Sequence, residues 1–253
     1  MNKEKLIKEA RNPKYISGIY NYCDRWCERC QFTASCLNYK IGQENYSDLE
    51  KHDISSAEFW EGFSNLMKDT IDMIKDMALE HGIGLDSIET VEKETSSENV
   101  IHLTSEMAYK YITLVDDWFD SCKYVYEDSE IYQRLNHSKE AAVKFDDIIQ
   151  IIRWYQMQIY VKLQRALDGE MDEDNDFSED FPNDSDGSAK VALIGIDRSI
   201  GSWTKMLDFF PDRKEKLIKI ISFLNRLCSI VERKFPKARE FVRPGFDQID
   251  DAN

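Results

Sequence analysis

The chain has 253 residues, of which 42% are hydrophobic and 32% are charged, and its formal net charge is −15. This composition is typical of a globular protein with one or two domains. The negative charge disfavours nucleic-acid binding, because phosphates would be repelled and no basic cluster is visible. No run has the roughly 18 apolar residues of a membrane helix, and the N-terminal residues lack the apolar core of a signal peptide. We therefore expect a cytoplasmic protein with no membrane partner, whose cysteines stay reduced.

Apolar residues recur mostly at helical spacing, and few segments alternate as strands do. In chain order, we predict helices over residues 3–10, from about 14 into a cysteine-rich segment, and over 55–82, 104–126, 138–167, 188–210 and 212–235. Ser55 and Glu58 have the spacing of a capping box, and Ser138 can cap the helix that follows it. The middle of that helix is apolar on more than one face, which predicts a central position.

The predicted fold class is therefore all-α, a helical bundle of six or seven helices with an N-terminal metal-binding cysteine segment. We expect residues 1–45 to form the N-terminal segment, 46–236 the bundle and 237–253 an irregular tail. Within the bundle, residues 168–187 include ten acidic side chains and no basic one before Gly187. Because such a block repels itself, we predict an acidic flexible loop there.

Four cysteines lie within fourteen residues, at Cys23, Cys27, Cys30 and Cys36, with the spacing C-x3-C-x2-C-x5-C. If the helix from about residue 14 continues, Cys23, Cys27 and Cys30 share one face. Cys36 would then close the site after a turn. Four thiolates this close would repel one another without a cation, so we predict that they are metal ligands.

Two cofactors are compatible with this spacing. Structural zinc sites usually pair two short knuckles across a longer loop, and no second pair is present here. Iron–sulfur clusters accept ligands from one short segment, which favours a 4Fe–4S cluster over zinc. Zinc remains the alternative.

The last three cysteines, in CERCQFTASC, resemble the cluster-binding stretch of SPASM domains in radical enzymes and the iron–sulfur staple of certain bacterial exonucleases. In those families the fourth cysteine comes from elsewhere in the chain, which by this resemblance would be Cys23. The resemblance covers about fourteen residues. It implies an iron–sulfur cluster, but neither the radical-enzyme activity nor the nuclease activity. As a whole, the chain is more similar to a bacterial helical protein with four cysteines than to any enzyme family.

A second candidate site is polar. Asp197 and Arg198 lie among apolar residues and glycines inside a predicted helix, and Asp197 falls close to the apolar stripe. A buried aspartate needs a partner, which we expect to be Arg153 or Arg226 of a neighbouring helix. Structural ion pairs explain these residues, and a polar pocket in the bundle core containing Asp197, Arg198 and Arg153 is the other interpretation.

Three function hypotheses follow. The first is an iron–sulfur protein with a redox, sensing or structural role and a redox or protein partner, because four protein ligands leave no open iron site. The second is a protein-interaction module stapled by zinc. The third is an enzyme that uses the polar pocket, although no catalytic set of residues can be assigned from the sequence.

Overall fold

The computed structural model describes residues 3–46, 55–80, 82, 103–122, 137–171 and 184–247. These residues contain seven α-helices, three short 3-10 turns and no strand. The chain divides into two compact units, one of Met1–Tyr20 with Cys27–Val100 and one of Asn21–Trp26 with Ile101–Asn253. The prediction of an all-α fold is confirmed for the described part of the chain.

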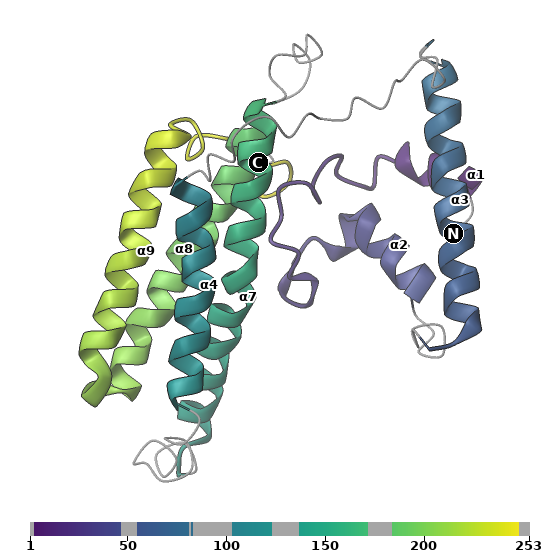
Figure 1. Cartoon of the computed structure of the whole chain (residues 1–253). Helices are drawn as coiled ribbons and strands as arrows, with labels where there is room; N and C mark the ends of the chain where they lie inside the picture. Colours follow the sequence, from purple (N-terminus) through teal and green to yellow (C-terminus); the bar gives the residue numbers. More distant parts are fainter. Residues whose placement is uncertain are drawn as a thin grey trace, which may run out of the picture. The chain divides into compact units, whose positions relative to one another are not determined.

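The second unit is a four-helix bundle. Its helices are α4 (Leu103–Cys122), α7 (Lys139–Met171), α8 (Asp184–Phe209) and α9 (Lys214–Lys234). Helices α4 and α8 each pack against both α7 and α9, so the four helices close a ring. They run up and down in alternation (Figure 1). The predicted bundle therefore exists, and it has four of the seven described helices.

Large apolar side chains from all four helices fill the centre of this bundle. Trp203 of α8 is fully buried, and its indole N–H donates to the hydroxyl of Tyr111 at 3.0 Å. The ring of Trp118 meets Trp203 edge to face at 5.7 Å between centroids. Helix α7 buries Ile152, Tyr155, Ile159 and Leu163 completely, as expected for the helix predicted to be central.

Local polar contacts stabilise the start of α7 and the segment where α7 ends and α8 begins. The hydroxyl of Ser138 accepts the N–H of Ala141 at 3.2 Å, which confirms the predicted cap. Residues 168–171 and 184–187 are helical, so the prediction of an acidic loop over 168–187 is wrong at both ends. The cause is in part Arg165, which binds both carboxylate oxygens of Asp184 at 2.8 Å and offsets the acidic repulsion. Residues 172–183 lie outside the described residues.

Residues 21–26, called the strap below, belong to the bundle unit although they lie far from it in sequence. Tyr22 packs against Phe241 at 4.7 Å between ring centroids. Both rings need the space beside Gly187 of α8, where a Cβ atom would overlap them. Residues 236–247 follow α9 as successive turns, and Asp247 pairs with Lys190 of α8 at 2.9 Å.

The first unit contains α1 (Lys3–Ala10), α2 (Leu37–Tyr46) and α3 (Ala57–Glu80). Helix α2 was not expected from the sequence. Two ion pairs join α1 to α2, Lys5 with Glu44 at 2.8 Å and Lys40 with Glu9 at 3.0 Å.

Helix α3 begins and ends with recognisable signals. The hydroxyl of Ser56 accepts the N–H of Phe59 at 3.1 Å and caps the helix, and the capping box predicted from Ser55 and Glu58 stays a prediction. Gly82 follows the helix with φ of 71°, and its N–H donates to Leu79 O at 3.1 Å. The apolar stripe along α3 is exposed, with exposed fractions of 45% for Phe63, 46% for Met67, 45% for Ile71 and 56% for Ile74.

Candidate functional site

The cysteine segment is not a helix. Between α1 and α2 the backbone forms irregular turns and two short 3-10 helices, η1 (Cys27–Arg29) and η2 (Thr33–Ser35). The prediction that the first three cysteines share a helix face is therefore wrong. Gly18 and Arg25 have φ of 72° and 60°, in the left-handed region that a right-handed helix cannot contain.

The four candidate cysteines are distributed over both units. Cys23 lies in the strap, and Cys27, Cys30 and Cys36 belong to the first unit. All four are free and partly buried. In the part of the chain that the structure describes, no three histidine, cysteine or acidic side chains are grouped closely enough to hold a metal ion. That these four cysteines bind a metal therefore stays a prediction.

Two of these sulfur atoms nevertheless accept a backbone hydrogen bond from the residue two positions later. The N–H of Phe32 donates to Cys30 Sγ at 3.4 Å. The N–H of Arg25 donates to Cys23 in the same way, and this contact opposes the rise in the pKa of the Cys23 thiol that burial causes. Donors of this kind stabilise the thiolate form, which is the form that binds metals.

The strap that carries Cys23 is fastened to the bundle on both sides of the cysteine. Before it, the ammonium group of Lys162 donates to the carbonyl of Asn21 at 2.9 Å. After it, the indole N–H of Trp154 donates to the carbonyl of Asp24 at 2.9 Å. The ring of Trp26 stacks on Trp154 at 4.9 Å between centroids. Lys162 is only 5% exposed, and burial lowers its pKa to about 8.

The carboxylate of Asp24 adds a charged anchor. The hydroxyl of Tyr155 donates to Asp24 Oδ2 at 2.5 Å, and Arg198 Nη1 donates to the same oxygen at 2.8 Å. Arg198 also hydrogen-bonds the Tyr155 hydroxyl. Burial, together with the nearby Asp24 carboxylate, raises the pKa of Tyr155, so the phenol stays protonated. Sequence reasoning singled out Arg198 but missed Asp24 and Tyr155, which lie far from it along the chain.

The other residues of the expected polar pocket have separate partners. Asp197 has a side chain that is 49% exposed, and it pairs with Arg239 at 2.5 Å instead of Arg153 or Arg226. Arg153 pairs with Asp116 at 2.7 Å, and its guanidinium lies 4.1 Å from the ring centroid of Phe119. Asp197, Arg198 and Arg153 thus join three different networks and share no partner among the described residues.

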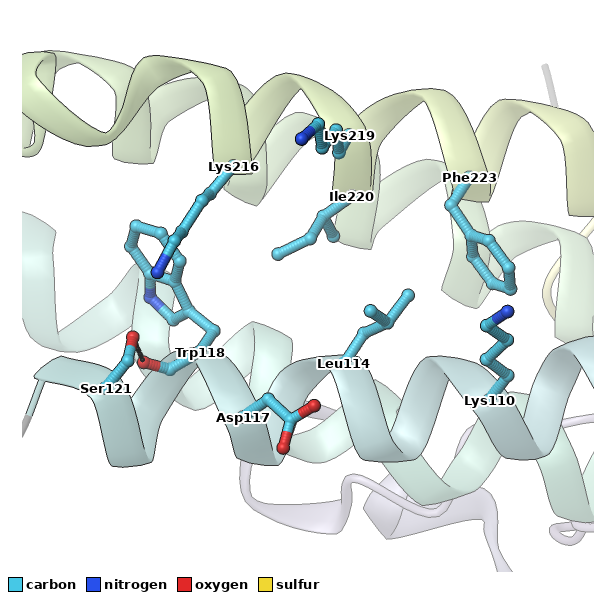
Figure 2. A pocket seen from close by; sticks show the side chains of 9 residues that line it. All are labelled: Lys110, Leu114, Asp117, Trp118, Ser121, Lys216, Lys219, Ile220 and Phe223. Atoms are coloured by element: carbon cyan, nitrogen blue, oxygen red, sulfur yellow. Dashed lines mark hydrogen bonds between the residues drawn. The ribbon is translucent and has the colours of Figure 1, made fainter.

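A groove of about 350 Å³ lies between α4 and α9 (Figure 2). Its apolar surface comes from Leu114, Trp118, Ile220 and Phe223, and three lysines stand around it, Lys110, Lys216 and Lys219. In the sequence, Lys216 and Lys219 belong to a basic stretch, residues 213–219, that alternates with apolar residues and indicates the solvent-exposed face of one helix. The one sequence signal for a groove is that a lysine, Lys219, stands next to an apolar residue, Ile220. This pair indicates a groove only when the helix that faces α9 is known.

The described residues are thus all-helical, and a segment with one candidate ligand, Cys23, is tied to a four-helix bundle. Within the described ranges, none of the helices has both the length and the apolarity that a membrane crossing requires. No protein-family model matches the chain, and neither a curated protein nor a solved structure is similar to it.

Proposed function

We propose that Cys23, Cys27, Cys30 and Cys36 bind a 4Fe–4S cluster in the cytoplasm, and that the protein has a redox, sensing or structural role. The observation that carries the proposal is the pair of backbone N–H groups that donate to Cys30 and Cys23 from two residues further on. The close spacing of the four cysteines supports it as well, because one short segment can then provide every ligand.

The backbone conformation of Arg25 supports a role for the N–H groups that bind the cysteine sulfurs. A left-handed φ of 60° is costly for a residue with a side chain, by roughly 1–2 kcal/mol. This conformation accompanies an N–H that points at the Cys23 sulfur. Hydrogen bonds to cysteine sulfurs tune the potential of bound clusters and orient the ligands.

With four cysteine ligands, a bound cluster would supply one-electron transfer and would leave no iron open to a substrate. The other residues of the strap would hold the ligating cysteine, Cys23, in place. Trp26, three residues after Cys23, stacks on Trp154 of α7, whose indole N–H binds the carbonyl of Asp24 next to the cysteine.

The test is anaerobic purification followed by a visible spectrum and elemental analysis. We expect about four iron and four sulfide per chain, and a brown colour that is lost in Cys30→Ala. The matched control is Cys228→Ala, which removes a free, partly buried cysteine outside the segment and should keep the colour. A colourless protein without iron, or colour that survives Cys30→Ala, would contradict the proposal.

The exposed apolar stripe of α3 favours a second candidate function, a zinc-stapled module that binds a protein partner. Its members Phe63, Met67, Ile71 and Ile74 are each about half exposed, which is unusual for side chains of this size on one helix face. Stoichiometric zinc without colour would select this candidate. A change of Ile71 to glutamate should then abolish binding to the partner and leave the zinc content unchanged.

A further inference from the structure

The groove between α4 and α9 is separate from the cysteine segment, and every residue that lines it belongs to the bundle unit. Its volume of about 350 Å³ is at the lower end of the range for sites that hold small molecules. Its apolar part includes Trp118, which is 3% exposed, and Ile220, which is 5% exposed, so the floor is made of well-packed core side chains.

The charge around the groove is opposite to that of the chain. Lys110, Lys216 and Lys219 line it, against the single carboxylate of Asp117. None of the three lysines forms an ion pair with another described residue. In a chain with net charge −15, three lysines without an ion pair among the described residues, placed around one apolar groove, favour an anionic ligand.

One end of the groove also has an unused hydrogen-bond donor. The indole N–H of Trp118 is buried and has no acceptor among the described residues. Buried donors are nearly always paired in folded proteins. We therefore expect a bound ligand to supply the acceptor for this N–H. The guanidinium of Arg213 lies 5.9 Å from the Trp118 ring centroid and donates to the carbonyl of Ser121 at 3.1 Å, which adds positive charge at the same end.

We infer that this groove binds a small amphipathic carboxylate. Figure 2 shows the Lys216 side chain reaching from α9 toward Trp118 and Ser121 on α4, while Leu114 and Ile220 face each other across the middle. The carboxylate occupies the end formed by Trp118, Ser121 and Lys216. The apolar chain lies along Leu114, Ile220 and Phe223.

The dimensions favour a small molecule over a peptide. From Lys216 to Phe223 the groove follows seven residues of α9, which is about 10 Å of helix. This length fits an extended chain such as that of decanoate. A docked helical peptide of three turns would need more than the available 350 Å³.

The test is isothermal titration of the full chain with decanoate, decanol and vesicles that contain phosphatidylglycerol. We expect decanoate to bind, decanol to bind at least about tenfold more weakly because it lacks the charge, and the vesicles not to bind. Lys216→Glu should weaken decanoate at least about tenfold. Lys214→Glu, an exposed lysine of the same helix outside the groove, is the matched control and should change the affinity less than about twofold.

Three results would overturn this assignment, provided that circular dichroism shows folded protein. They are no decanoate binding at about 1 mM, equal binding to Lys216→Glu and the natural protein, and vesicle binding without decanoate binding. If Lys216→Glu does not fold, Lys216→Gln tests the same contact. The outcome is independent of the metal content, so it does not depend on the proposed cluster.

Discussion

The four-helix bundle and the strap satisfy their backbone groups in different ways. Within the bundle, the helices pair their own N–H and carbonyl groups and bury apolar faces such as that of Trp203. In the strap, the carbonyls of Asn21 and Asp24 are bound by Lys162 and Trp154, side chains of α7. One region is thus organised by its local sequence and the other by contacts with distant residues.

This difference predicts how each region responds to substitution. Loss of a bundle core side chain should reduce the global free energy of unfolding, because all four helices share that core. Loss of a strap contact should release a few residues around Cys23 and leave most of the fold intact.

The first prediction concerns the centre of the bundle. Trp203→Ala should lower the free energy of unfolding by about 3–5 kcal/mol, because it leaves a large cavity and removes the donor to Tyr111. Chemical denaturation followed by far-ultraviolet circular dichroism measures this loss. The control is Met157→Ala on α7, whose side chain is 53% exposed and should matter by less than about 1 kcal/mol. Similar losses for both variants would show that the bundle has no central core.

The second prediction concerns the site where the strap meets α8. Gly187→Ala should lower stability by about 1–2 kcal/mol, because the new Cβ would overlap the Tyr22 ring and lie 2.8 Å from Phe241. Gly201→Ala is the matched control on the same helix, with no atom within 4 Å of its Cβ. It should stabilise by about 0.5–1 kcal/mol through helix propensity. Thermal unfolding of both variants gives the comparison, and a stabilising Gly187→Ala would contradict the observed packing of the strap.

The third prediction concerns the charged anchor of the strap. Asp24→Asn weakens the bonds from Tyr155 and Arg198, and we expect a loss of only about 1 kcal/mol because the Arg198 side chain is 54% exposed. The local effect should be larger, with several-fold faster alkylation of the Cys23 thiol in metal-free protein, followed by mass spectrometry. Alkylation of Cys228 serves as the internal control. An unchanged Cys23 rate would mean that Asp24 does not hold the strap.

The bundle could be predicted from the sequence because its pattern is local. Met107, Tyr111, Val115 and Trp118 recur every three or four residues, and this spacing defines the buried face of α4 directly. Pro211 ends α8 as expected, because proline cannot continue a helix. Ser138 caps α7 for an equally local reason.

The cysteine segment and the groove could not be predicted in the same way. Helical spacing of Cys23, Cys27 and Cys30 is a valid local pattern, but the left-handed Arg25 and the bonds from α7 override it. The contact of Asp24 with Arg198 joins residues that no local pattern links. The groove needs α4 and α9 to face each other, and the sequence does not state which helices are neighbours.

The smallest expected effect lies in the turns after α9 and depends on pH. Arg243, together with Lys190, holds the pKa of the Asp247 carboxyl well below its ordinary value. The unfolded chain therefore binds a proton at a pH where the folded chain does not, so stability increases with pH in that range. The contribution is complete above the ordinary aspartate pKa of about 4 and is lost progressively as the pH falls below it.

Asp247→Asn should accordingly lower stability by about 1 kcal/mol near neutral pH. The difference from the natural protein should shrink as the pH falls from about 5 toward about 2, because the unfolded natural chain takes up a proton at Asp247 in this range and the advantage of the charged carboxylate in the folded state decreases. Urea unfolding at several pH values measures the difference. Asp212→Asn, an exposed carboxylate without an ion pair among the described residues, should give a small difference at every pH. A gap for Asp247→Asn that stays constant in acid would show that the turns after α9 do not depend on this charge, so that their contact with the bundle is apolar, through residues such as Ala238.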